Sequence, residues 1–151
     1  VHVAEHSSFL RSYQRYAPRS LLPAEVDRYY TETAVVAEML GAAGVPKSAA
    51  AVADYLERMR PQLEYGERVR EVRRILMHAP APSLAIKPFS RLFLHAGEQL
   101  LPDWALAMMG TRPLPAPRRL ALDASVRAVA PTFRWALRNG AAARARLRTR
   151  G

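Results

Sequence analysis

The sequence predicts an all-α fold in which about six to seven amphipathic helices form one irregular helical domain. Apolar residues recur at helical spacing along most of the chain, and no segment alternates polar and apolar residues as a strand does. Glycine is scarce, with 7 residues in 151, whereas alanine, the strongest helix former, is abundant. Half of the residues are hydrophobic and 24% are charged, which excludes a disordered chain and fits a single core.

The first half of the chain is divided into helices by prolines, a glycine and a capping residue. Pro23 suits the first position of a helix, and Gly41 suits a helix end. Ser48 is a candidate N-cap because its hydroxyl can accept a hydrogen bond from the first turn. The expected helices cover residues 1–17 and 23–40, a short segment between Ser48 and Pro61, and residues 62–78.

In the second half, prolines again separate the apolar stripes. We expect breaks at Ala79-Pro80-Ala81-Pro82 and at a stiff linker formed by Pro113, Pro115 and Pro117. The expected helices are one with an apolar stripe over 89–101, a short one from Pro102 to Gly110, and a last one that includes 122–137 with a kink at Pro131. We expect one core from the inward faces, and its members include Phe9, Tyr13, Val26, Tyr30, Phe93, Leu100 and Phe133.

The net charge of +10 is concentrated near the C-terminus. Residues 1–111 carry 13 Lys and Arg against 12 Asp and Glu, whereas residues 112–151 carry 10 Arg against Asp123 alone. A nucleic acid or another acidic partner could bind such an Arg-rich end, which we keep as an alternative function. A solvated helix face followed by a frayed basic tail over 139–151 explains the same charge, so we expect no specific nucleic-acid binding. The arginines concerned lie beside Trp135 and in the tail: Arg127, Arg134, Arg138, Arg144, Arg146, Arg148 and Arg150.

Several function classes lack their motifs in this sequence. There is no cysteine, and therefore neither a thiolate nucleophile nor a cysteine-ligated metal site. We find no glycine-rich phosphate loop and no G-x-S-x-G elbow. No apolar run approaches the ~18–20 residues of a membrane span. The chain begins at Val1 without a secretory apolar segment, so we expect part of a longer, cytoplasmic protein.

One local motif suggests metal chemistry. His2-Val3-Ala4-Glu5-His6 fits the H-x-x-E-H pattern of zinc peptidases, in which two histidines one helical turn apart ligate zinc and the glutamate acts as a base. A third ligand is missing, because Glu71 and Glu98 lie in ordinary amphipathic surroundings. Histidines on an aromatic helix face are more often structural, so a zinc hydrolase is a second alternative.

The remaining histidines are isolated. His78 ends a basic helix, where a cationic side chain complements the helix dipole. His95 lies off the apolar stripe of its helix. We therefore expect both to be structural or exposed.

A series of short motifs runs along the chain in this order: Val1–Leu10 with Tyr13 and Tyr16, Leu22-Pro23-Ala24-Glu25 to Tyr29-Tyr30-x-Glu32, Leu40-Gly41, Val45-Pro46 with Tyr55, Met59-Arg60-Pro61-x-Leu63, Leu100-Leu101-Pro102-x-Trp104 with Gly110, Arg119-Leu120, and Arg134-Trp135-Ala136-Leu137. In this order the motifs resemble the MpaB/latex-clearing-protein family of oxygenases over residues 1 to about 138.

This resemblance implies an all-α oxygenase domain that holds haem b and uses O₂ on an apolar or isoprenoid-like substrate. It also implies that residues 1–138 are the C-terminal part of that domain, because the family's haem-ligating histidine belongs to a segment upstream of this sequence. The axial ligand is then not expected in this chain. His2 is the one family-matched position that we place near the haem pocket, as a cofactor-binding residue.

Overall fold

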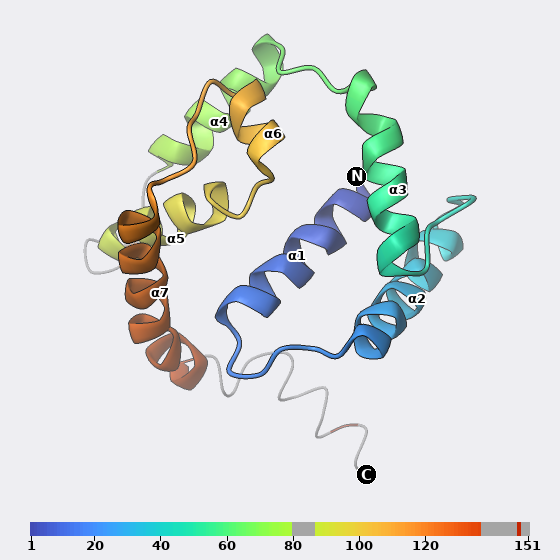
Figure 1. Ribbon diagram of the computed structural model, residues 1–151, viewed down its shortest axis with the longest axis horizontal. Coiled ribbons are helices and arrows are strands. Elements are labelled where there is room, and N and C mark those ends of the chain that lie inside the picture. Colours follow the sequence, from blue (N-terminus) through green and yellow to red (C-terminus); the bar gives the residue numbers. More distant parts are fainter. Residues whose placement is uncertain (80–86, 137–147, 149–151) are drawn as a thin grey trace.

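The computed structural model describes residues 1–79, 87–136 and 148, and within these residues the chain is all-α, as predicted (Figure 1). It has no strand among them. None of the described helices is long and apolar enough to cross a membrane. The helices are α1 (His2–Tyr16), α2 (Pro23–Met39), α3 (Ala49–Met59), the 3₁₀ helix η1 (Arg60–Gln62), α4 (Glu67–His78), α5 (Lys87–Glu98), α6 (Asp103–Met108) and α7 (Ala116–Ala136).

The predicted start and stop residues act as expected. Pro23 is the first residue of α2, and the Ser48 hydroxyl accepts a hydrogen bond from the Ala51 N–H at 3.2 Å, which caps α3. Gly41 and Gly110 follow the ends of α2 and α6 with φ of +90° and +67°, values that favour glycine because it has no Cβ.

Two predicted boundaries are wrong. The helix expected from residue 62 begins at Glu67, because Pro61 belongs to η1 and Leu63 and Gly66 adopt extended backbone. Pro117 is not part of the linker but lies in the first turn of α7, where a missing N–H costs no intrahelical hydrogen bond. The predicted break at 80–82 and the tail at 139–151 fall outside the described residues, except Arg148.

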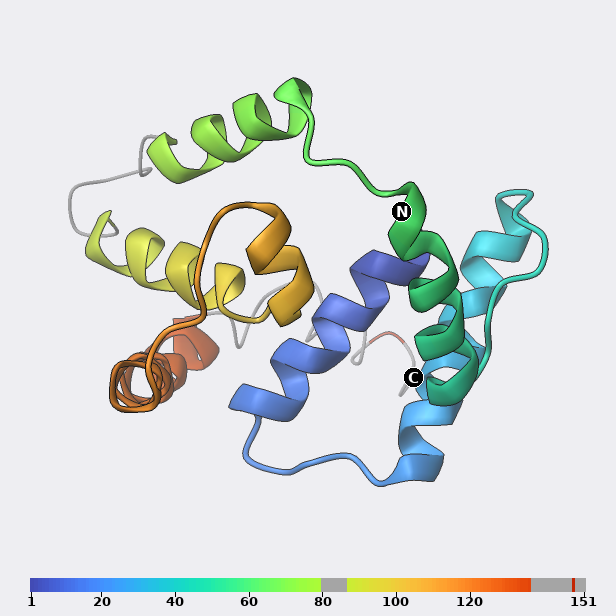
Figure 2. The ribbon, with the colours of Figure 1, turned by 45° about the horizontal axis from the view of Figure 1, so that its top comes forward.

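Helix α1 lies between two groups of helices. Helices α2 and α3 pack against one of its sides, and α7 contacts the other, with α5 packed on α7 (Figures 1 and 2). A cluster of buried side chains joins the first three helices, namely Leu10, Val26, Tyr30 and Val52. Ala96, Leu106 and Val126 are buried in the other group, on α5, α6 and α7. The packing therefore places α1 where it can share a site with α5 and α7.

The predicted core is correct in part. Val26 and Tyr30 are buried, and Leu100 and Phe133 are half-buried. The prediction is wrong for Phe9, Tyr13 and Phe93, which are 57%, 46% and 37% exposed. Their helical spacing identified the apolar face of each helix, but Tyr13 and Phe93 border an open cleft, and Phe93 contacts Phe133 of α7 only edge-on.

Candidate functional site

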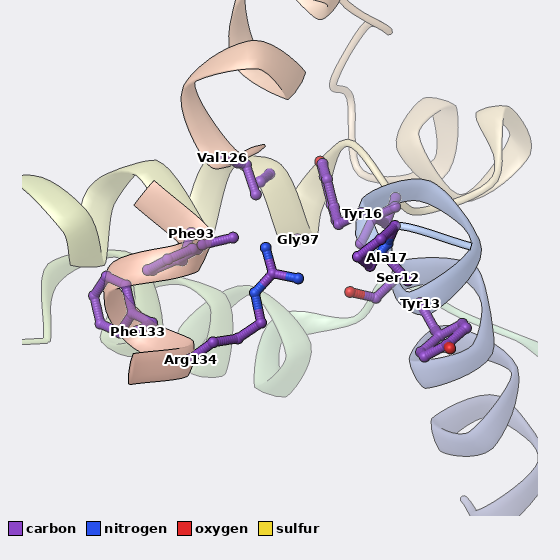
Figure 3. Close-up of a pocket in the computed structure, with 13 residues that line it drawn as sticks. Ser12, Tyr13, Tyr16, Ala17, Phe93, Gly97, Val126, Phe133 and Arg134 are labelled. Carbon is purple, nitrogen blue, oxygen red and sulfur yellow. The ribbon is translucent and has the colours of Figure 1, made fainter. Parts of the chain in front are cut away.

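An apolar cleft of about 630 Å³ lies between α1, α5 and α7 (Figure 3). Its volume falls within the range of roughly 300–1,000 Å³ that is typical of small-molecule sites. The side chains that line it are mostly aliphatic or aromatic, and the set comprises Ser12, Tyr13, Tyr16, Ala17, Pro18, Phe93, Ala96, Gly97, Leu100, Val126, Ala130, Phe133 and Arg134. Such a lining favours a largely hydrocarbon ligand, because binding removes apolar surface from water.

A carboxylate on α7 fixes the position of α1 beside the cleft. The Arg15 guanidinium donates two hydrogen bonds to Asp123, at 2.9 and 3.0 Å, and the Tyr16 hydroxyl donates a third at 3.2 Å. Arg127 on α7 also donates to the Arg15 carbonyl at 3.0 Å. Burial and the Asp123 charge raise the pKa of Tyr16, so its hydroxyl stays protonated and continues to donate.

The α5 wall combines aromatic rings with open space. The Phe133 ring packs edge-on against Phe89 and Phe93, with centroid distances of 5.7 and 4.9 Å. A Cβ added at Gly97 would meet no atom within 4 Å, so this glycine leaves room in the cleft. The Arg11 guanidinium ties α1 to the end of this wall by donating to the Leu100 carbonyl at 2.9 Å.

The structure describes only some of the arginines that make the C-terminal end of the chain basic. Arg127 contacts α1, and Arg134 extends into the cleft, as Figure 3 shows. Trp135 is largely exposed. Arg138, Arg144, Arg146 and Arg150 lie outside the described residues, so the structure does not test the nucleic-acid alternative.

His2 and His6 lie close together, but away from the cleft. Their rings on α1 are 4.2 Å apart between centroids, and the Tyr29 hydroxyl lies 2.9 Å from His6 Nδ1. The Tyr29 hydroxyl also donates to the His6 carbonyl at 3.4 Å, which leaves its oxygen to accept from an Nδ1–H. Burial and the neighbouring His2 lower the pKa of His6, and Glu5 opposes this shift.

The structure brings no complete zinc site together in the part of the chain that it describes. No group of three or more histidines, aspartates or glutamates there could hold a metal ion. Glu5 is exposed, Glu71 pairs with Arg74, and Glu98 accepts a hydrogen bond from Arg73 Nε at 3.0 Å. His2 and His6 therefore have no third protein ligand among the described residues.

The two isolated histidines are exposed, as predicted. His78 Nδ1 donates to the Arg74 carbonyl at 2.8 Å at the end of α4, and His95 points away from the cleft that its helix borders.

Sequence reasoning missed Ser12, Gly97 and Asp123 as members or supports of the site. Asp123 is separated from its partner Arg15 by 108 residues, so no local pattern reveals the pair. Asp123 is nevertheless the single acidic residue in 112–151, and a lone carboxylate in a strongly basic segment is a usable signal for a partner arginine.

The comparisons with known proteins agree with the architecture. Residues 1–135 match the family described as ER-bound oxygenase mpaB/B′/rubber oxygenase, catalytic domain. No curated protein and no solved structure matches the chain. The match covers α1 to α7 almost completely, including every residue that lines the cleft. The chain therefore belongs to the MpaB and rubber oxygenase catalytic-domain family.

Proposed function

We propose that this chain supplies the substrate-binding cleft of a haem b-dependent oxygenase, which uses O₂ on an apolar, isoprenoid-like substrate. The observation that carries the proposal is the apolar cleft between α1, α5 and α7 in a chain of this family. The substrate's hydrocarbon would lie against Phe93, Phe133 and Leu100 and displace water from these side chains. The role of the chain's own residues is to bind and orient that hydrocarbon, and to keep the reacting region dry.

The cleft by itself does not fit a haem iron. Its lining residues include no histidine, cysteine or methionine, the side chains that most often bind haem iron. A raised pKa disfavours the Tyr16 phenolate, and Tyr13 at the rim is 46% exposed to water. We therefore assign no cleft residue to the iron, and we propose that the axial ligand comes from the upstream segment that the family resemblance implies.

His2 is the residue that the family resemblance places near the haem, as a cofactor-binding residue. It lies in the first turn of α1, whereas the cleft contacts the last turns of the same helix. A contact between His2 and haem would therefore be made outside the cleft. If His2 contacts the haem, the haem absorption spectrum of His2→Ala is expected to differ from that of wild type.

Equilibrium binding of squalene, an unsaturated isoprenoid hydrocarbon, tests the proposed role of the cleft. Gly97→Leu would place a side chain in the open space that the cleft offers, so we expect it to weaken squalene binding at least about tenfold. Ala128→Leu adds the same side chain at an exposed position of α7 that does not line the cleft, and it is expected to bind like wild type. Equal binding by both variants, or no binding by wild type, would refute the proposal.

A further inference from the structure

Arg134 is the one charged residue in the described lining of the apolar cleft. No aspartate or glutamate accompanies it there. Its guanidinium makes no hydrogen bond or ion pair with any other described residue, whereas Arg15 and Arg73 of the same molecule are paired with Asp123 and Glu98. Among the described residues, therefore, nothing balances the positive charge of Arg134 in the cleft, and its N–H donors are available to a ligand.

Asp123, which lies about three helical turns away from Arg134 on α7, does not neutralise this charge. Both oxygens of Asp123 accept hydrogen bonds from Arg15, and one of them also accepts from the Tyr16 hydroxyl. Arg127, the other arginine that α7 directs toward α1, donates to a backbone carbonyl and adds positive charge to this side of the molecule. An anion in the cleft would thus meet a favourable potential.

A second polar group faces Arg134 from the opposite wall. Figure 3 shows the Arg134 side chain reaching across the cleft from α7, with the Ser12 hydroxyl of α1 turned toward it. The Ser12 hydroxyl makes no hydrogen bond with the other described residues, unlike those of Ser7 and Ser8, which donate to the Ala4 carbonyl. Most of the remaining lining residues, including Phe93 and Val126, are apolar, apart from the hydroxyls of Tyr13 and Tyr16.

We propose that the cleft binds an amphiphile, an unsaturated hydrocarbon chain that ends in a single carboxylate. The carboxylate would accept hydrogen bonds from the Arg134 guanidinium and the Ser12 hydroxyl, and the chain would lie on the aromatic and aliphatic wall. One guanidinium matches the single charge of a carboxylate, whereas a diphosphate would require further cations. This inference rests on the proposed function and names the substrate class of the same cleft.

Competition binding with oleic acid and oleyl alcohol at pH 8 separates the contribution of the head group, because the two ligands share one hydrocarbon chain. We expect wild type to bind oleate about tenfold more tightly than the alcohol, as for one charge-assisted hydrogen-bonded pair. Arg134→Gln is expected to bring this ratio close to one, because oleate binding weakens much more than alcohol binding. Ser12→Ala is expected to lower the ratio by a smaller factor, and Arg118→Gln, an exposed position of α7 outside the cleft, is the matched control.

The outcomes distinguish this inference from the function on which it rests. If oleate and oleyl alcohol bind equally to wild type and to Arg134→Gln, the carboxylate specificity is refuted and the apolar cleft remains. If oleyl phosphate binds more tightly than oleate, the cleft prefers a phosphate head group, and the proposed preference for a carboxylate is wrong. If neither ligand binds and Gly97→Leu changes nothing, both the inference and the proposed function fail.

Discussion

Asp123 joins two helices that are far apart in the sequence. Its carboxylate accepts hydrogen bonds from Arg15 and Tyr16 of α1, and the side chains of Arg15 and Asp123 are 26% and 14% exposed. A bidentate pair with such limited solvent contact is worth more than a surface ion pair, because water and salt screen it less.

Asp123→Asn removes the charge of this pair and is expected to lower the free energy of unfolding by about 1–2 kcal/mol. The matched control is Glu32→Gln, which breaks the exposed pair of Arg28 and Glu32 and is expected to lower the free energy of unfolding clearly less than Asp123→Asn does. Urea denaturation of both variants measures the difference, and equal losses would contradict the special role of Asp123.

His6 makes stability depend on pH. Burial and the neighbouring His2 lower the pKa of His6, so between its folded and unfolded pKa values the unfolded chain binds more protons. Stability therefore rises with pH across this window, and the contribution of His6 is lost as pH falls below about 6.5, the ordinary histidine value. We expect His6→Gln to flatten the dependence of the unfolding free energy between pH 7 and 5. An unchanged slope would assign the dependence to other groups.

Among the helices, α5 contains a glycine that is unfavourable in a helix but leaves room in the cleft. Gly97 lies near the end of α5 with open space where a Cβ would be. Gly97→Ala is expected to raise the free energy of unfolding by about 0.5–1 kcal/mol, because alanine loses less backbone entropy in a helix. Gly110→Ala is the contrasting variant: its φ of +67° makes alanine unfavourable by roughly 1–2 kcal/mol. Thermal denaturation measures both variants. If both were more stable than wild type, or both less stable, this account would be wrong.

The molecule as a whole is expected to bind haem poorly when no other segment supplies a ligand. Because the described cleft provides no imidazole, we expect hemin added to this chain to bind weakly and without one-to-one stoichiometry. Absorption titration across the Soret region measures this binding. A stoichiometric spectrum would contradict the prediction, and its loss in His2→Ala or His6→Ala would then identify the ligand.

The basic end of the chain is expected to contribute neither to stability nor to specific nucleic-acid binding. Deleting residues 139–151 is expected to leave the free energy of unfolding unchanged, and nucleic-acid binding is expected to be weak and to vanish by physiological salt. No aromatic residue follows Trp135 to stack on bases, so the remaining contacts would be to phosphates. Electrophoretic mobility shifts over a salt series measure this. A salt-tolerant, sequence-selective complex that disappears with the deletion would favour the binding-module alternative.

The amino-acid sequence was sufficient to predict the helical elements and most of their ends. Periodicity identified the helices, and Pro23, Gly41, Ser48 and Gly110 marked boundaries through backbone chemistry that acts within a few residues. The order of short motifs indicated the family, which the match over residues 1–135 established. These features are local or are fixed by residue order, so they can be read without knowing how the helices pack.

Which apolar faces are buried, and where the cleft lies, depends on how the helices pack against one another. Tyr13 and Phe93 have the same helical spacing as core residues, yet they border the cleft that lies between α1, α5 and α7. The contacts that hold α1 beside α7, such as the one between Arg15 and Asp123, join residues more than a hundred positions apart. Periodicity reports which face of a helix is apolar, but the partner of that face depends on long-range packing, which no local pattern contains.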